Sequence, residues 1–118
     1  MSGAQATQML KGVLRLLLLE LLSEGESYGY EVVLRLRERG LDGAGEGSVY
    51  PALSRLEREG LLASKLEAST RGAARKYYRL TADGRAALVE AREAWVVLRD
   101  AVESIRTPAE SEATDVPA

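Results

Sequence analysis

A run of hydroxyl and guanidinium side chains between residues 48 and 58 could form hydrogen bonds with nucleic acid. Serine and arginine bind phosphate oxygens and base edges, and tyrosine can bind a phosphate or stack on a base. These residues recur at helical spacing opposite an apolar stripe, which is also the pattern of an ordinary amphipathic helix facing water. The polar face contains Ser48, Tyr50, Ser54, Arg55 and Arg58, and the apolar face Val49, Ala52, Leu53 and Leu56.

A second candidate site for phosphate binding lies in the turn-rich stretch that follows, where cations flank a glycine. Glycine lets the backbone approach a ligand closely, and cations release counterions when they meet phosphates. Between Ser48 and Leu80 seven basic residues stand against three acidic ones, a local charge of +4, although the whole chain carries −2. Local sign matters more than the total for a phosphate partner. The candidates here are Arg71, Gly72, Arg75 and Lys76.

The chain contains no cysteine and no histidine among its 118 residues. This composition excludes disulfides, thiolate or imidazole metal sites and a serine–histidine triad. We therefore expect no enzyme activity, no cofactor and no metal. The apolar run 13–22 contains two charges and is shorter than the roughly 20 residues that cross a bilayer. The expected location is the cytoplasm, with no membrane partner.

Hydrophobic periodicity places the candidate residues among helices. Residues 7–23 predict a first helix that is apolar on nearly every face, so we expect a second subunit to cover part of it. A second helix is expected over 28–39, with Ser27 as its N-cap. A third helix is expected from residue 47 or 48 to 59, with Pro51 in its first turn.

After the third helix the apolar period changes from helical to two-fold. The alternating runs 61–68 and 74–80, separated by a turn-rich stretch, predict a β-hairpin. A helix of about 26 residues, roughly 39 Å long at 1.5 Å per residue, is expected over 81–106, with Thr81 as its N-cap. Residues 107–118 are polar and acidic, and we expect them to be disordered.

This order of elements is that of a winged helix-turn-helix with a C-terminal helix, so we expect a mainly α fold with a small β-hairpin (α+β). Residues 7–80 would form the winged helix-turn-helix DNA-binding domain, 81–106 a dimerisation helix and 107–118 an acidic tail. In this motif the later helix enters the major groove while its neighbour crosses the backbone.

Three segments resemble the PadR family of transcriptional regulators. They are YGYEV at 28–32, SVYPALSRLEREGLL at 48–62 and ARKYYRLTADGRAAL at 74–88. The resemblance covers roughly residues 8–106, and the single terminal helix is similar to the compact branch of the family, which includes multidrug-sensing repressors. It implies a homodimer that represses transcription from a palindromic operator in double-stranded DNA and is often released by a small effector.

The resemblance also implies which residues contact DNA. Tyr30 and Tyr78 fit packing positions as well, and for Tyr78 we favour packing. Carried over by position, the implied contacts are Tyr28, Tyr30, Ser48, Tyr50, Pro51, Ser54 and Arg55, with Arg71, Gly72, Arg75 and Lys76 in the wing.

The final helix carries apolar residues at alternating spacings of three and four, the a/d pattern of paired helices. Burial of such a seam, at about 25 cal/mol per Å² of apolar surface, is the expected driver of dimer formation. Two recognition helices would then meet successive major grooves about 34 Å apart. The expected interface residues are Leu88, Ala91, Trp95, Leu98, Val102 and Ile105.

Trp95, the only tryptophan, lies in the middle of this seam. In the multidrug-sensing regulators that the chain resembles, a tryptophan here lines a pore between subunits where flat aromatic ligands stack. Arg92 and Arg99 lie three residues before and four after Trp95, hence on the same side of the helix. They would favour flat anionic or electron-rich effectors. The alternatives are that Trp95 is interface core only and that both arginines face water.

A winged helix can also act as a protein–protein adaptor without sequence-specific DNA binding. An adaptor needs no cationic wing, whereas this hairpin is cationic, so the sequence favours a DNA-binding transcriptional regulator.

Overall fold

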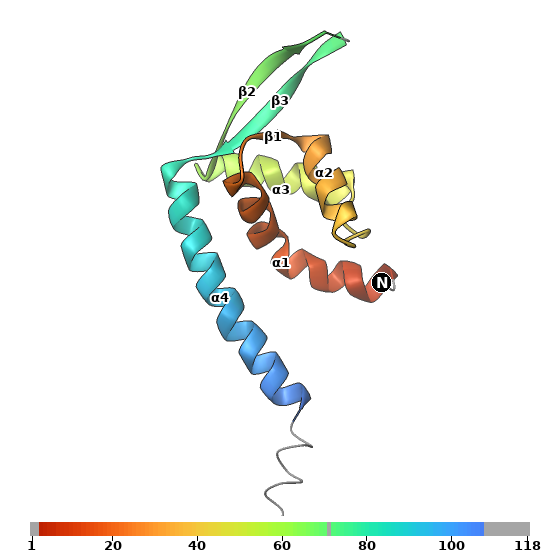
Figure 1. Cartoon of the computed structure of the whole chain (residues 1–118), viewed down its shortest axis with the longest axis vertical. Helices are drawn as coiled ribbons and strands as arrows, with labels where there is room; N and C mark the ends of the chain where they lie inside the picture. The colour runs from red at the N-terminus through yellow and green to blue at the C-terminus, as the bar shows by residue number, and fades with distance from the viewer. Residues whose placement is uncertain (1–2, 71, 108–118) are drawn as a thin grey trace, which may run out of the picture. The chain divides into compact units, whose positions relative to one another are not determined.

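The computed structural model describes residues 3–70 and 72–107, which form four helices and one three-stranded antiparallel sheet. This mainly helical fold with a β-hairpin confirms the winged helix-turn-helix expected from the sequence. Along the chain the elements are α1 (Gly3–Ser23), β1 (Ser27–Tyr28), α2 (Gly29–Glu38), α3 (Glu46–Arg58), β2 (Leu62–Ser69), β3 (Gly72–Leu80) and α4 (Ala82–Arg106) (Figure 1). The chain divides into one compact unit up to Leu88 and another from Val89 onward.

The core of the first unit is built from the apolar faces of α1, α2 and α3 under the sheet. α1 begins at Gly3, four residues earlier than expected, because alanine and glutamine at positions 4–6 extend a helix readily. Its second half is largely covered within its own chain, so only part of α1 is left for a second subunit to cover. The fully buried large side chains are Leu18, Leu19, Val32, Val33, Leu36, Val49 and Leu53.

The start of α2 differs from the sequence-based expectation. Ser27 is not the N-cap: it is fully buried in the short strand β1, where it pairs with Tyr78 of β3. Tyr28 takes the N-cap position with extended backbone and no side-chain cap bond. The Ser27 hydroxyl instead donates to Glu31 Oε1 at 2.5 Å. A two-residue strand that depends on pairing with distant β3 leaves no local periodicity to predict it.

α3 begins at Glu46, which moves Pro51 out of the first turn, where it was expected, into the helix interior. A proline there removes the N–H that would bond the carbonyl of Gly47. The N-cap residue is Gly45, which has no side chain that could accept a capping hydrogen bond. The outcome is a helix that starts earlier than its cap signals suggest and exposes Pro51 on its outer face.

The sheet has strand order β1-β3-β2, and the β2–β3 hairpin extends beyond the helices (Figure 1). Alternation along β3 divides its side chains between two faces. Tyr78 and Leu80 are buried against the helices, whereas Arg75, Tyr77 and Arg79 lie on the opposite face. Arg71, the expected residue of the hairpin turn, lies outside the described residues. Gly72 opens β3 with a φ of 141°, in the region that favours glycine.

Thr81 caps α4 as the sequence predicted. Its Oγ1 accepts a hydrogen bond from the Gly84 amide at 3.0 Å and donates one to the Gly60 carbonyl at 2.7 Å. These bonds join the start of α4 to the turn that follows α3. Among the described residues no helix has the length and apolarity to cross a membrane. The expected acidic tail lies almost wholly outside the described residues.

Candidate nucleic-acid interface

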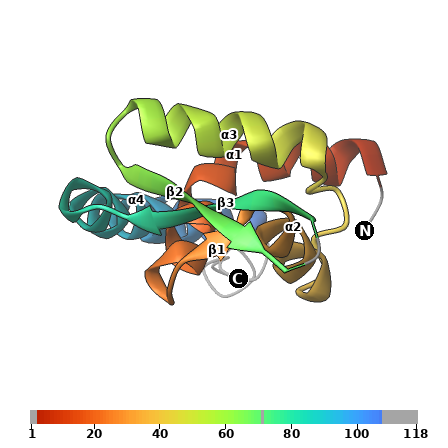
Figure 2. The same ribbon diagram turned by 90° about the horizontal axis from the view of Figure 1, so that it is seen from above.

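The outer face of α3 separates two concave surfaces of the first unit. With 100° per residue, Tyr50 lies on one flank of the helix, Pro51 and Arg55 lie on the other, and Ser54 lies between them. One concavity, which we call the tyrosine hollow, reaches from α3 to the start of α2 and to β3. The other, the α1–α3 hollow, lies between the helices that give it its name. α1 and α3 contact each other, and Figure 2 shows α1 behind α3 when the molecule is seen from above.

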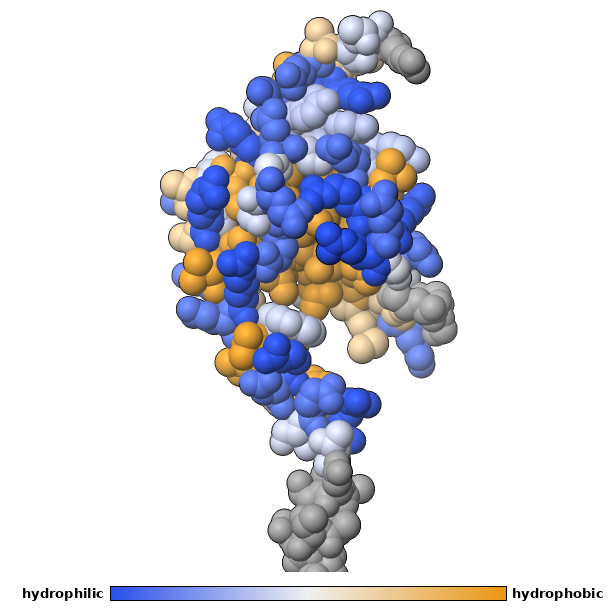
Figure 3. All heavy atoms as spheres, in the orientation of Figure 1, coloured by the Kyte–Doolittle hydropathy of each residue, from blue (hydrophilic) through white to orange (hydrophobic). Residues whose placement is uncertain are grey.

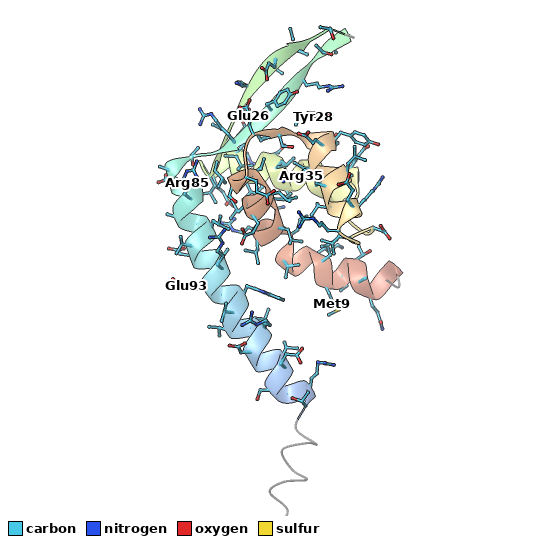
Figure 4. The ribbon with its side chains drawn as sticks, in the orientation of Figure 1. Met9, Glu26, Tyr28, Arg35, Arg85 and Glu93 are labelled. Atoms are coloured by element: carbon cyan, nitrogen blue, oxygen red, sulfur yellow. The ribbon has the colours of Figure 1, made fainter. Side chains whose placement is uncertain are left out.

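The tyrosine hollow has a volume of about 580 Å³ and brings together five of the predicted DNA contacts from four elements, β1, α2, α3 and β3. Tyrosine hydroxyls and cations converging on one concave surface can bind phosphate oxygens. Figure 4 shows Tyr28 where the base of the sheet meets α2. The predicted contacts in the hollow are Tyr28, Tyr30, Tyr50, Arg75 and Lys76, and Gly29, Leu34 and Tyr78 complete its wall.

Gly29 positions the ring of Tyr50. A Cβ atom at residue 29 would lie 2.2 Å from Cε1 of Tyr50, so the ring rests directly against the glycine backbone. Burial, and secondly the nearby Glu46 carboxylate, raise the pKa of the Tyr50 hydroxyl above its ordinary value. Like any tyrosine hydroxyl it is protonated at neutral pH, and it can donate to a phosphate oxygen.

Arg75 is held on the solvent face of the sheet by aromatic rings. Its guanidinium lies 4.5 Å from the centre of the Tyr28 ring, and Tyr28 meets Tyr77 edge to face at 5.4 Å. A cation over a tyrosine face is attracted by the ring quadrupole. Arg75 is thus exposed but oriented, a suitable arrangement for binding a phosphate.

Lys76 differs from Arg75 in its environment. Successive side chains of a β-strand point to opposite faces, so Lys76 lies on the face of β3 that is turned toward α3. Its Nζ lies 3.0 Å from Glu57 Oε1, and the other Glu57 oxygen accepts a hydrogen bond from Ser64 of β2. These bonds, that of Ser64 first, lower the pKa of the Glu57 carboxyl, and the bond to Glu57 raises the pKa of Lys76. Glu57 therefore ties the hairpin to α3 and offsets the charge of Lys76. No local sequence pattern indicates this role of Glu57, because its partners are 7 and 19 residues away.

The remaining predicted DNA contacts on α3 lie either on the flank opposite Tyr50 or on the face between the two hollows. Ser48, Pro51 and Arg55 line the α1–α3 hollow, together with Lys11 and Arg15 of α1, which no sequence motif singled out. Ser54 is half-buried on the face between the hollows. Gly72 is exposed near the hairpin tip, and Arg71 lies outside the described residues.

The predicted interface residues on α4 have unequal exposure in the single chain. Leu88 is only 4% exposed and belongs to the core of the first unit, so it offers no surface to a partner. Ala91 is half-buried. Farther along, apolar side chains lie at the surface of the helix among polar ones (Figure 3). The exposed members of the seam are Trp95, Leu98, Val102 and Ile105.

The arginines beside Trp95 are exposed. Arg99 donates to Asp100 Oδ1 through Nε at 3.2 Å and Nη2 at 3.1 Å, so its charge is partly offset by its neighbour. Trp95 itself is 40% exposed. A substantial part of the indole surface is therefore accessible in the single chain.

The first unit contains the three helices α1, α2 and α3, followed by a β-hairpin that is bonded to α3, and the outer face of α3 is polar and exposed. This arrangement defines a winged-helix DNA-binding regulator. The model of the transcriptional regulator PadR-like family matches residues 18–90. The chain belongs to this family, which confirms the resemblance seen in its motifs.

Similar proteins include regulators from several bacteria. Transcriptional regulator Rv3488 of Mycobacterium tuberculosis is 38% identical over 84 residues, which cover 71% of this chain and 77% of that protein. The structure of a PadR-like transcriptional regulator from Bacillus cereus is 39% identical with a TM-score of 0.75, covering 85% of this chain and 97% of that one. A PadR family regulator from Eggerthella lenta is 36% identical with a TM-score of 0.76, covering 85% and 87%. The protein is therefore a transcriptional regulator and not an enzyme.

Proposed function

We propose that the protein is a homodimeric repressor that binds a palindromic operator in the cytoplasm and leaves it when a small planar effector binds. The observation that supports DNA reading most directly is the outer face of α3, flanked by two concave surfaces that carry cations and hydroxyls. A helix of roughly 10–12 Å diameter fills a major groove about 12 Å wide. Its flanks then meet the phosphate backbones and its apex the base edges.

The dimer is supported by the exposed apolar seam of α4. Trp95, Leu98 and Val102 are each at least 40% exposed in the single chain, in the a/d spacing of paired helices. A contiguous apolar stripe of this kind is unfavourable in water, and a two-fold partner would bury it against itself. The part of the seam that can pair starts at Ala91, since Leu88 is already buried in its own chain.

The operator test combines selection with a salt titration. Binding sites are first selected from random duplexes, and the recovered sequence is expected to be an inverted repeat. The Arg75→Ala variant should then weaken binding to operator and unrelated duplex alike. It should also reduce the slope of log affinity against log salt by about 0.9 for each phosphate that the protein no longer neutralises. Ser54→Ala should instead change the preferred bases and leave the salt slope unchanged.

Two results would contradict this assignment. No enriched sequence in the selection, with neither variant altering DNA affinity, would favour a protein–protein adaptor built on the same fold. An enriched sequence without internal symmetry would contradict the palindromic operator while leaving DNA binding intact.

The effector proposal is supported by the exposed indole of Trp95 and by the cations at Arg92 and Arg99. Cations at the edge of an aromatic wall favour flat anionic or electron-rich molecules. Planar aromatic anions are therefore expected to quench Trp95 fluorescence and to lower operator affinity in the same concentration range. Quenching by planar cations and not by anions would contradict the predicted charge preference.

A further inference from the structure

The α1–α3 hollow, with a volume of about 370 Å³, carries three cations from two helices. Lys11 and Arg15 come from α1 and Arg55 from α3. The buried Leu14 and Leu56 form its floor, so the cations surround an apolar base. The hollow is therefore a positively charged surface formed by α1 and α3 alone, and it includes no residue of the β-hairpin or of α2.

The charge of this hollow is only partly compensated. Arg15 Nη1 lies 2.6 Å from Glu59 Oε1, and each side chain is about half exposed. Among the residues that the structure describes, neither Lys11 nor Arg55 forms an ion pair. Three cations and one carboxylate leave a local charge of about +2, which favours an anionic partner.

The position of the hollow on α3 indicates which anion it would meet. Its lining residues Ser48, Pro51 and Arg55 lie on the flank of α3 opposite Tyr50, which faces the tyrosine hollow. The major groove is bounded by two phosphate backbones about 12 Å apart. When α3 fills the groove, one backbone passes the tyrosine hollow and the other passes Lys11 and Arg15.

We infer that the α1–α3 hollow binds a phosphate of the DNA backbone, with Lys11 and Arg15 of α1 as contacting residues beside Arg55. This inference rests on the proposed DNA-binding function and adds α1 to the elements that touch the duplex. The interaction is made with the backbone, so it contributes affinity to every sequence equally.

The test uses the full chain with Lys11→Ala, Arg15→Ala and the double variant, on the selected operator and on an unrelated duplex. Each phosphate that is no longer neutralised should lower the magnitude of the salt slope by about 0.9, counted twice in a dimer, with the ratio of operator to unrelated affinity unchanged. Arg85→Ala is the matched control: Arg85 is exposed at the start of α4, lines neither hollow, and should leave the slope unchanged (Figure 4). Thermal melting followed by circular dichroism verifies that each variant is folded.

The outcomes separate the two proposals. Wild-type slopes in the folded double variant, with intact operator binding, would overturn the α1 interaction and leave the DNA-binding function standing. A change in the operator-to-unrelated ratio would also overturn it, because a backbone interaction carries no base preference. Absence of DNA binding by the wild-type chain would overturn both.

Discussion

Changing Leu98 to aspartate is expected to leave the protein monomeric and to weaken operator binding at least about 100-fold. Leu98 is 53% exposed in the single chain and lies in the middle of the α4 seam. Burial of a leucine contributes about 1.5–3 kcal/mol, and a dimer loses it twice. The carboxylates would in addition have to be buried near one another across the two-fold axis, which is unfavourable.

The decrease in DNA affinity follows from the dissociation of the dimer. In the proposed dimer, two linked winged-helix domains bind two half-sites with a high effective concentration for the second, and separated monomers lose this advantage. Sedimentation at micromolar protein concentration measures the mass, and fluorescence anisotropy on the operator recovered by selection measures affinity.

Val97→Asp is the matched control for this substitution. Val97 is 71% exposed and lies about 100° round the helix from Leu98, away from the a/d seam. The variant introduces the same charge next to the same position and is expected to remain dimeric with unchanged affinity. A dimeric Leu98→Asp protein would show that the subunits meet elsewhere.

Changing Gly84 to alanine is expected to destabilise the fold by about 3 kcal/mol. A Cβ atom there would lie 2.1 Å from the carbonyl oxygen of Leu61 and 3.1 Å from Cδ2 of Leu80. The Leu61 oxygen also accepts a hydrogen bond from the amide of Thr81 at 3.1 Å. The main chain that joins α3, the sheet and α4 must therefore move, because a backbone carbonyl cannot rotate away as a side chain can.

Gly12→Ala is the matched control: it makes the same chemical change but is expected to stabilise the fold. Gly12 is exposed in α1, and no atom lies within 4 Å of the position that its Cβ would occupy. Alanine is preferred over glycine in a helix, so this variant should be more stable by about 0.5–1 kcal/mol. Urea unfolding at one fixed protein concentration compares both variants with the wild type. Equal stability of Gly84→Ala and the wild type would contradict the close packing of α4 on Leu61.

Several parts of the fold and the candidate site could be predicted because their signals are local. The apolar stripe of α3 and the Thr81 cap depend on spacings of three or four residues, and the structure confirms both. The change from helical to two-fold period marks the hairpin in the same way. The family motifs lie within these segments, which is why class and family were evident before any tertiary contact was known.

Features that depend on contacts between distant residues were not predictable. The two-residue strand β1 exists only because Ser27 and Tyr28 pair with β3, about 50 residues later. The partner of Lys76 is Glu57, and no pattern in the sequence gives the distance between the hairpin and the end of α3. Leu88 has the spacing of the seam, yet it is buried in its own domain.

The sequence by itself determined the class of protein, the order of its elements and the polar face of α3, because apolar periodicity and turn residues act over one or two helical turns. The tertiary structure alone decided which side chains share a surface. It brought Tyr28, Tyr50 and Arg75 into one hollow and Lys11, Arg15 and Arg55 into another. The physical reason is that the packing of helices and the register of strands depend on the whole core, and residues far apart in the chain meet only once that core has formed.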